Sequence, residues 1–279
     1  MKCSFNKLLK IFVLVVTLLV SQPSFGRRMV LSATTRKPIA YASVGILDRQ
    51  MGTVTDSSGY FTLQTSGLNP NDILKISCIG YEPKCYSIAD FANMPDSIFL
   101  TEKQIPLQEI VVKPQKIKNR TVGRKNGGGF ICIEIEGDRA AGQGVATPLK
   151  VKKRAWLKEL GFSVINNSHT LSSMKFRVNI YRKDGDRYEL DNIPPVYFDY
   201  SRKDLDNKGR FLFSFPCEIM LEKGEYYVEL EFLHDFRNEF FVMKTKPMTG
   251  KTRYRYASQS GWKTLPFGAP IYINYDNVE

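Results

Sequence analysis

The chain has 279 residues, a formal net charge of +12 and only two histidines, His169 and His234. That length allows two small domains. Neither histidine begins a His-x-x-Glu pair, which excludes the usual zinc-hydrolase ligand pattern, and no catalytic, cofactor or metal site is predicted.

Residues 1–26 are predicted to be a secretory signal peptide. Residues 11–20 form an apolar run, and Ser24, Phe25 and Gly26 supply a small-residue cleavage site before Arg27. The run is short for a membrane span, although an uncleaved anchor stays open as an alternative. The protein is therefore expected to be secreted across the inner membrane and to act in the periplasm or at the outer membrane.

Cleavage would lower the formal charge from +12 to +9, because it removes Lys2, Lys7 and Lys10 and no acidic residue. The remaining surplus would allow peripheral contact with an anionic membrane surface or an acidic polysaccharide. Nucleic acid is not expected as a partner of a secreted protein of this composition.

Short strands separated by turns are predicted next. Val44, Ile46, Val54, Phe61 and Leu63 follow the two-residue period of half-buried strands. Residues 56–59 predict a turn, in which an Asp carboxylate accepts from backbone N–H groups ahead of it and a Gly supplies a positive φ. A further strand that ends in a Gly turn is predicted over residues 73–81.

The ordered motifs of this region resemble the carboxypeptidase-D regulatory-like domain, a small β-sandwich related in fold to transthyretin. The motifs are KPIAYASV at residues 37–44, GTVTDSSGYF at residues 52–61 and ILKISCIGY at residues 73–81. The segment IPLQEIVV at residues 105–112 resembles the end of that domain. The resemblance implies a binding or spacer module over residues 27–112 and carries no hydrolase activity of its own.

Residues 113–129 are predicted to be a flexible linker, because they combine six lysines and arginines with no acidic residue and end in three glycines. Residues 130–279 contain many short alternating segments separated by Gly and Pro turns, which indicate a second, jelly-roll-like β-sandwich. The fold class is thus all-β, with two β-sandwich domains, the first transthyretin-like. The order of domains resembles that of uncharacterised envelope proteins of Bacteroidetes.

Four cysteines follow the signal peptide. Cys78 and Cys85 flank a predicted hairpin turn and would either form a disulfide in an oxidising compartment or be buried thiols on adjacent strands. Cys132 and Cys217 lie in apolar strands and are expected to be buried thiols.

Residues 204–209 superficially resemble a calcium loop, but Lys208 would repel the ion, so a turn is predicted. Tyr197, Tyr200, Tyr254, Tyr256 and Trp262 lie in polar segments. Tyr254, Tyr256 and Trp262 are the candidate ligand-binding residues, because aromatic faces stack on sugar rings, although such side chains also cap the rims of sandwiches.

The sequence thus predicts a non-catalytic secreted envelope protein that binds or assembles through contacts with an envelope protein. A carbohydrate-binding module that captures a polysaccharide is the alternative. A hydrolase that uses a histidine or a cysteine is a second alternative, for which no motif is present.

Overall fold

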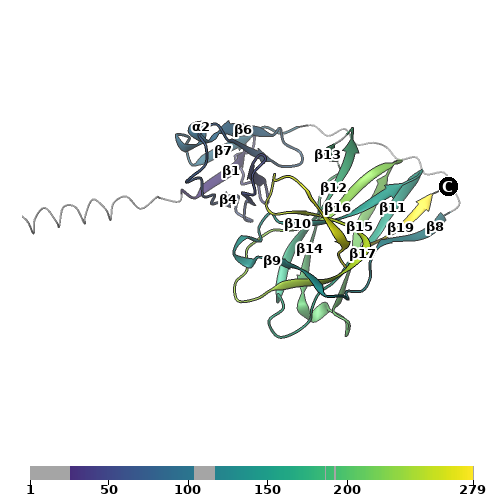
Figure 1. The fold of residues 1–279 in the computed structure, drawn as a ribbon. Helices are drawn as coiled ribbons and strands as arrows, with labels where there is room; N and C mark the ends of the chain where they lie inside the picture. Colours follow the sequence, from purple (N-terminus) through teal and green to yellow (C-terminus); the bar gives the residue numbers. More distant parts are fainter. Residues whose placement is uncertain (1–25, 104–116, 186, 192, 279) are drawn as a thin grey trace, which may run out of the picture.

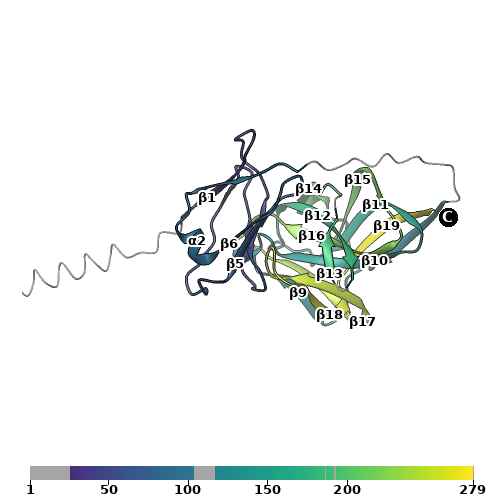
Figure 2. The same ribbon diagram turned by 90° about the horizontal axis from the view of Figure 1, so that it is seen from above.

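The computed structural model describes residues 26–103 and 117–278, apart from residues 186 and 192. The predictions for the signal peptide and for residues 105–112 fall outside the described residues. Nearly every described element is a strand, and the strands form four sheets, which confirms the all-β prediction. Figures 1 and 2 show the smaller first domain beside a larger second domain.

The first domain is a sandwich of a three-stranded and a four-stranded sheet. The smaller sheet has the order β4 (Tyr60–Phe61), β1 (Arg28–Ser32), β7 (Ser97–Leu100). The larger sheet has the order β3 (Gly52–Val54), β2 (Ser43–Ile46), β5 (Ile73–Ser77), β6 (Lys84–Ser87). Alternate apolar residues of both sheets share one buried core, among them Val30, Val44, Phe61, Leu74 and Ile98.

The turn at residues 56–59 has the hydrogen bonds and the glycine conformation that the sequence predicts. The Asp56 carboxylate accepts from the backbone N–H groups of Ser58 and Tyr60 at 2.8 and 2.9 Å, and Gly59 has a φ of 77°. The single helix of this part, α2 (Ile88–Ala92), begins where the Ser87 hydroxyl accepts from the Asp90 N–H. These bonds satisfy the backbone groups that the strands leave unpaired.

The second domain contains an eight-stranded and a four-stranded sheet. The eight-stranded sheet runs β13 (Arg187–Leu190), β12 (Ser173–Asp184), β16 (Gly224–Phe232), β10 (Gly144–Val151), β17 (Phe241–Arg255), β18 (Lys263–Gly268). In addition, β14 (Val196–Ser201) pairs with β12, and β9 (Ile131–Ile135) pairs with β17. The four-stranded sheet runs β15 (Arg210–Leu221), β11 (Arg154–Ser163), β19 (Ile271–Val278), β8 (Ile117–Gly123).

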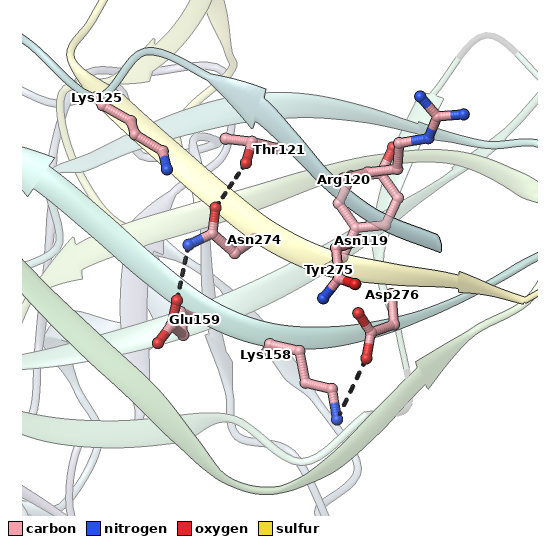
Figure 3. A pocket seen from close by; sticks show the side chains of 9 residues that line it. All are labelled: Asn119, Arg120, Thr121, Lys125, Lys158, Glu159, Asn274, Tyr275 and Asp276. Atoms are coloured by element: carbon pink, nitrogen blue, oxygen red, sulfur yellow. Dashed lines mark hydrogen bonds and ion pairs between the residues drawn. The ribbon is translucent and has the colours of Figure 1, made fainter. Parts of the chain in front are cut away.

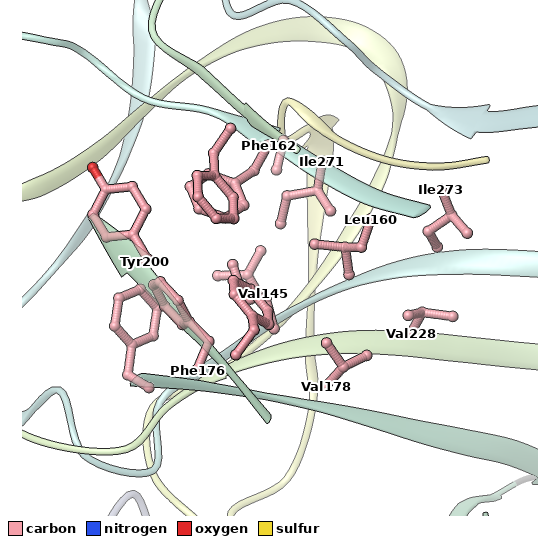
Figure 4. Packing of buried hydrophobic residues seen from close by; sticks show 14 of the residues in the cluster. Val145, Leu160, Phe162, Phe176, Val178, Tyr200, Val228, Ile271 and Ile273 are labelled. Carbon is pink, nitrogen blue, oxygen red and sulfur yellow. The ribbon is translucent and has the colours of Figure 1, made fainter. Parts of the chain in front are cut away.

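The core of the second domain is aromatic where its two sheets meet. Phe162 of β11 lies 5.8 Å from Phe176 of β12, 5.2 Å from Phe211 and 5.5 Å from Phe241, measured between ring centres (Figure 4). Tyr200, which the sequence placed among polar segments, is buried in the same cluster. Side chains from both sheets therefore interdigitate, as in a β-sandwich.

The linker prediction is wrong for residues 117–123. These residues form β8 at the edge of the four-stranded sheet, where they pair antiparallel with β19 from Tyr272↔Gly123 to Val278↔Ile117. Four of the seven residues are polar or charged, and all four are exposed. Their polarity is typical of an edge strand as well as of a linker, and charged residues protect such edges from unwanted pairing.

The disulfide alternative for Cys78 and Cys85 does not agree with the register of the strands. Cys85 pairs in register with Lys75, three residues away from Cys78, so the two thiols do not face each other and both are free. Cys78 packs against the core, and burial raises the pKa of its thiol, whereas Cys85 is exposed. Cys132 and Cys217 are exposed rather than buried, because they occupy the outward positions of alternating strands.

Alkylation of the folded protein tests this arrangement. Iodoacetamide is expected to modify Cys85, Cys132 and Cys217 quickly and Cys78 about tenfold more slowly, because the Cys78 thiol is buried and its pKa is raised. Peptide mass spectrometry gives the rate at each site. A disulfide-linked peptide containing Cys78 and Cys85 in the native protein would contradict the register.

Candidate functional site

The three predicted aromatic residues do not form one platform. Tyr254 is buried, and its ring meets that of Tyr256 edge-on at 4.6 Å, while its hydroxyl donates to Gln143. Trp262 contacts Tyr181 and Tyr227 instead, which lie on the outer face of the eight-stranded sheet. Because side chains alternate along β17, Tyr254 and Tyr256 point away from the face that Trp262 joins.

The two domains meet where the first presents β2 and β3. Gly45 and Gly52 face each other across these strands, and the backbone of Ser258 lies over both. A Cβ atom on Gly45 would lie 2.0 Å from the Ser258 carbonyl oxygen. Only glycine permits so close an approach, and Gln259 beside it donates to the Ser77 hydroxyl at 2.8 Å.

Arg177 of β12 joins the domains from the other side. Its guanidinium donates to the backbone carbonyl of Tyr41 and to the Ser43 hydroxyl, the latter at 2.9 Å. Tyr41 has a φ of 58°, a left-handed conformation that is uncommon for a residue other than glycine. The ring centres of Tyr41 and Tyr197 lie 5.5 Å apart, and both rings pack against a small hydrophobic cluster. Apolar packing therefore accompanies the hydrogen bonds of Arg177.

Behind Arg177 lies a buried network of four charges, which we call the junction network. Its members are Arg177, Glu229, Glu231 and Arg255, with the Asn179 amide between them. Arg177 Nε donates to Glu231 Oε2 at 2.7 Å, and Arg255 Nη2 donates to Glu229 Oε2 at 3.0 Å. Asn179 Nδ2 donates to both carboxylates, at 2.7 and 2.6 Å.

The register of the sheet brings these side chains together. Arg177, Glu231, Gly144 and Arg255 occupy one row across β12, β16, β10 and β17. A Cβ atom on Gly144 would lie 1.8 Å from Glu229 Oε1, so the absent side chain leaves the room through which Arg255 reaches the glutamates.

Burial opposes the ionisation of Glu229, Arg177 and Arg255. It raises the pKa of Glu229 to about 7, against the opposing attraction of Arg255. Burial also disfavours the charged form of Arg177, but Glu231 more than compensates and raises its pKa. Two arginines and two glutamates sum to zero when all are ionised, which is the arrangement in which buried charges are tolerated.

An aromatic surface continues from the network across the same sheet face. We call it the aromatic strip, and it consists of Tyr181, Tyr188, Tyr227 and Trp262. Tyr188 stacks on Tyr227 with ring centres 3.7 Å apart, and Arg255 lies 5.4 Å from the ring centre of Trp262. Arg253 covers Tyr227 at 5.2 Å. Tyr227 is buried against Tyr188 and Arg253, whereas Tyr188, Trp262 and Arg253 are half-buried and keep part of their surface exposed.

A polar hollow lies on the outer face of the four-stranded sheet (Figure 3). It measures about 450 Å³ and is lined by Asn119, Arg120, Thr121, Lys125, Lys158, Glu159, Asn274, Tyr275 and Asp276. Asn274 bridges two strands, because its amide accepts from the Thr121 hydroxyl at 2.8 Å and donates to Glu159 at 2.7 Å. Lys158 Nζ lies 3.6 Å from Asp276 Oδ2.

The remaining candidates of the sequence analysis are surface residues. His169 and His234 are exposed, and no group of three or more metal-ligating side chains occurs among residues 26–103 and 117–278. Asp206, in the calcium-like loop, accepts from the backbone of Lys208 and from Arg210, which confirms a turn. Within the same described residues, no helix has the length and apolar character needed to cross a membrane.

Comparison with known families identifies the first domain. Residues 29–112 match the family described as the CarboxypepD_reg-like domain, which confirms that part of the resemblance. The match ends before β8 and covers none of the second domain. A search of curated proteins finds no match for the chain.

Solved structures of viral particles give a distant match. "Structure of infectious bursal disease virus Gt strain" is 9% identical, with a TM-score of 0.28, and the alignment covers 90% of this chain and 63% of that one. "Structure of infectious bursal disease virus Gx strain" is 11% identical, with a TM-score of 0.24, and covers 89% and 54%. This chain thus spans less than two thirds of those proteins, and TM-scores this low carry no argument.

Removal of Arg177 tests the junction network. Arg177→Met should lower the free energy of unfolding by about 3 kcal/mol, because it leaves Glu231 buried with one cationic partner fewer. Denaturant unfolding followed by tryptophan fluorescence measures the change. The control is Lys150→Met, which removes an exposed ion pair with Glu225 and should leave stability nearly unchanged. Equal effects of both variants would contradict the role of burial.

Gly45→Ala tests the close approach of the domains. The new methyl group would collide with the Ser258 backbone, so the domains should separate and the radius of gyration measured by small-angle X-ray scattering should rise. Gly261→Ala is the matched control, because its Cβ would enter open space. An unchanged radius of gyration in Gly45→Ala would show that the two domains do not need this contact.

Proposed function

We propose that this protein is a non-catalytic binding or assembly module that contacts another protein of the cell envelope. The observation that carries the proposal is the aromatic strip, which is partly exposed beside the buried junction network. Tyrosine, tryptophan and arginine are the residue types that dominate the energetics of protein interfaces. Trp262, Tyr188 and Arg253 bring all three together on one sheet face.

The junction network supports the proposal because it restricts the motion of Arg255, which lies against the aromatic strip. Arg255 contacts Trp262 and is itself held by Glu229 and Glu231. Glu231 also pairs with Arg177, which donates to the first domain. A surface held in this way loses little conformational entropy when it binds a partner. The first domain would then act as a docking or spacer unit that buttresses the binding face.

The cellular place of this contact belongs to the proposal as well. The predicted signal peptide would direct the chain across the inner membrane, and the partner would lie in the periplasm or at the outer membrane. The positive charge of the chain would add peripheral attraction to an anionic membrane surface.

Cross-linking in the native envelope tests the proposal. The tagged protein should co-purify with one defined envelope protein, and Trp262→Ala should reduce that recovery about tenfold, because an interface tryptophan contributes about 2 kcal/mol. Quantitative mass spectrometry of the cross-linked material measures the loss. The control is Tyr256→Ala, which removes an exposed aromatic residue of the opposite side of β17 and should leave recovery unchanged.

Two results would overturn the protein-contact proposal. One is equal recovery of the partner with Trp262→Ala and the wild type. The other is recovery of polysaccharide without any protein, which would favour the glycan-capture alternative.

A further inference from the structure

The hollow on the four-stranded sheet contains a buried polar group that the fold leaves unsatisfied. Asp276 is 8% exposed, and its Oδ1 atom finds no hydrogen-bond partner among the described residues. Its other oxygen has only the long contact with Lys158, at 3.6 Å. A buried acceptor without a partner costs roughly 1–3 kcal/mol, so a carboxylate held at the wall of a hollow in this way is suited to a ligand that donates to it.

A second unsatisfied group stands directly opposite Asp276. Trp156 and Asp276 are paired across β11 and β19, and the Trp156 indole N–H also lacks a partner among the residues that the structure describes. One group is a donor and the other an acceptor, on neighbouring strands. A hydroxyl group, which both accepts and donates, is complementary to this pair. Both atoms have almost no accessible surface, and Trp156 lies beside the hollow rather than in its lining, so a ligand reaches the pair only when neighbouring side chains shift.

The other lining residues favour a neutral, polyhydroxylated ligand. Asn119, Thr121 and Asn274 supply amide and hydroxyl groups, and they lie in two rows across β8 and β19. Glu159 and Asp276 would repel a phosphate, whereas the three cationic side chains that line the hollow would repel a metal ion. Carboxylates, amides and lysines together are well suited to the adjacent hydroxyl groups of a sugar.

Aromatic rings flank these polar rows. Trp156 lies at one side, with Lys158 Nζ 5.9 Å from its ring centre. Tyr272 lies at the other, covering Gly161, with Lys125 Nζ 5.4 Å from its ring centre. Tyr272 is buried, whereas Trp156 is half-buried. Lys158 is long and exposed, so it can move aside and let the apolar C–H face of a sugar ring approach the Trp156 ring.

We propose that the hollow between β8, β19 and β11 binds a saccharide segment, with a sugar hydroxyl bridging the Trp156 indole N–H and the free oxygen of Asp276. This site lies on the sheet opposite the aromatic strip. The inference therefore goes beyond the proposed protein contact and does not depend on it.

Nuclear magnetic resonance reads this site directly, because the chain contains only two tryptophans, Trp156 and Trp262. Titration of the ¹⁵N-labelled protein with hexasaccharides of β-1,4-glucose, α-1,4-glucose, N-acetylglucosamine and β-1,4-mannose provides four defined neutral probes. At least one should shift the Trp156 indole signal saturably below about 10 mM, while the Trp262 signal stays in place and reports an intact fold.

Two variants distinguish a site from a surface effect. Asp276→Asn keeps the shape of the side chain but replaces one acceptor oxygen by an amide, and Trp156→Phe keeps a ring but removes the N–H. Each should weaken binding of the active probe about tenfold or more, which calorimetry measures. Both variants should leave the cross-linked recovery of a protein partner unchanged, so failure here is separate from failure of the protein-contact proposal.

Three outcomes would overturn the inference. The first is no saturable shift of Trp156 with any of the four probes. The second is binding that neither Asp276→Asn nor Trp156→Phe weakens. The third is an equal shift of Trp156 with inorganic phosphate, which would identify an anion-binding surface instead.

Discussion

The arrangement of the two domains depends on one buried arginine. Arg177 leaves the strand that carries it, pairs with Glu231 and donates to a backbone carbonyl and a hydroxyl of the first domain. A guanidinium can do this because its donors spread in a planar fork and remain charged when buried. A buried arginine needs carboxylate partners, and those carboxylates in turn need Arg255 as a second cationic partner. The contact of Arg177 with the first domain is therefore accompanied by a group of buried charges on this face of the sheet.

The first domain contributes its family motif to this contact. Tyr41 and Ser43, which meet Arg177, lie inside the KPIAYASV segment by which the domain is recognised. Val44 of the same segment faces the domain core, whereas Ser43 and Gly45 face the second domain. The alternation of the strand thus lets one short segment serve both the core of its own domain and the contact with the next.

The sequence predicted the fold better than the site, for a physical reason. Strand periodicity and turn chemistry are local, so the Asp56 turn and the alternating strands were foreseeable. Arg177, Glu229 and Glu231 occupy the polar positions of alternating strands, a pattern that normally indicates a solvent-facing side. Nothing in the strand itself shows that another domain covers that side. The strand at residues 117–123 was mistaken for a linker for a similar reason, because an edge strand and a linker can have the same polar composition.

Buried charged residues occur on the outer faces of both sheets of the second domain, but their hydrogen bonding differs. On the eight-stranded sheet two glutamates and two arginines are buried and paired with one another, and the first domain accepts hydrogen bonds from Arg177. On the four-stranded sheet Asp276 is buried by its own neighbours, yet one oxygen is left without a partner in the described structure. A buried charge that is paired within the fold is tolerated, whereas a buried group that is left without a partner beside a hollow costs stability unless something outside the chain completes it. The first arrangement supports the contact between the domains, and the second supports the proposed ligand.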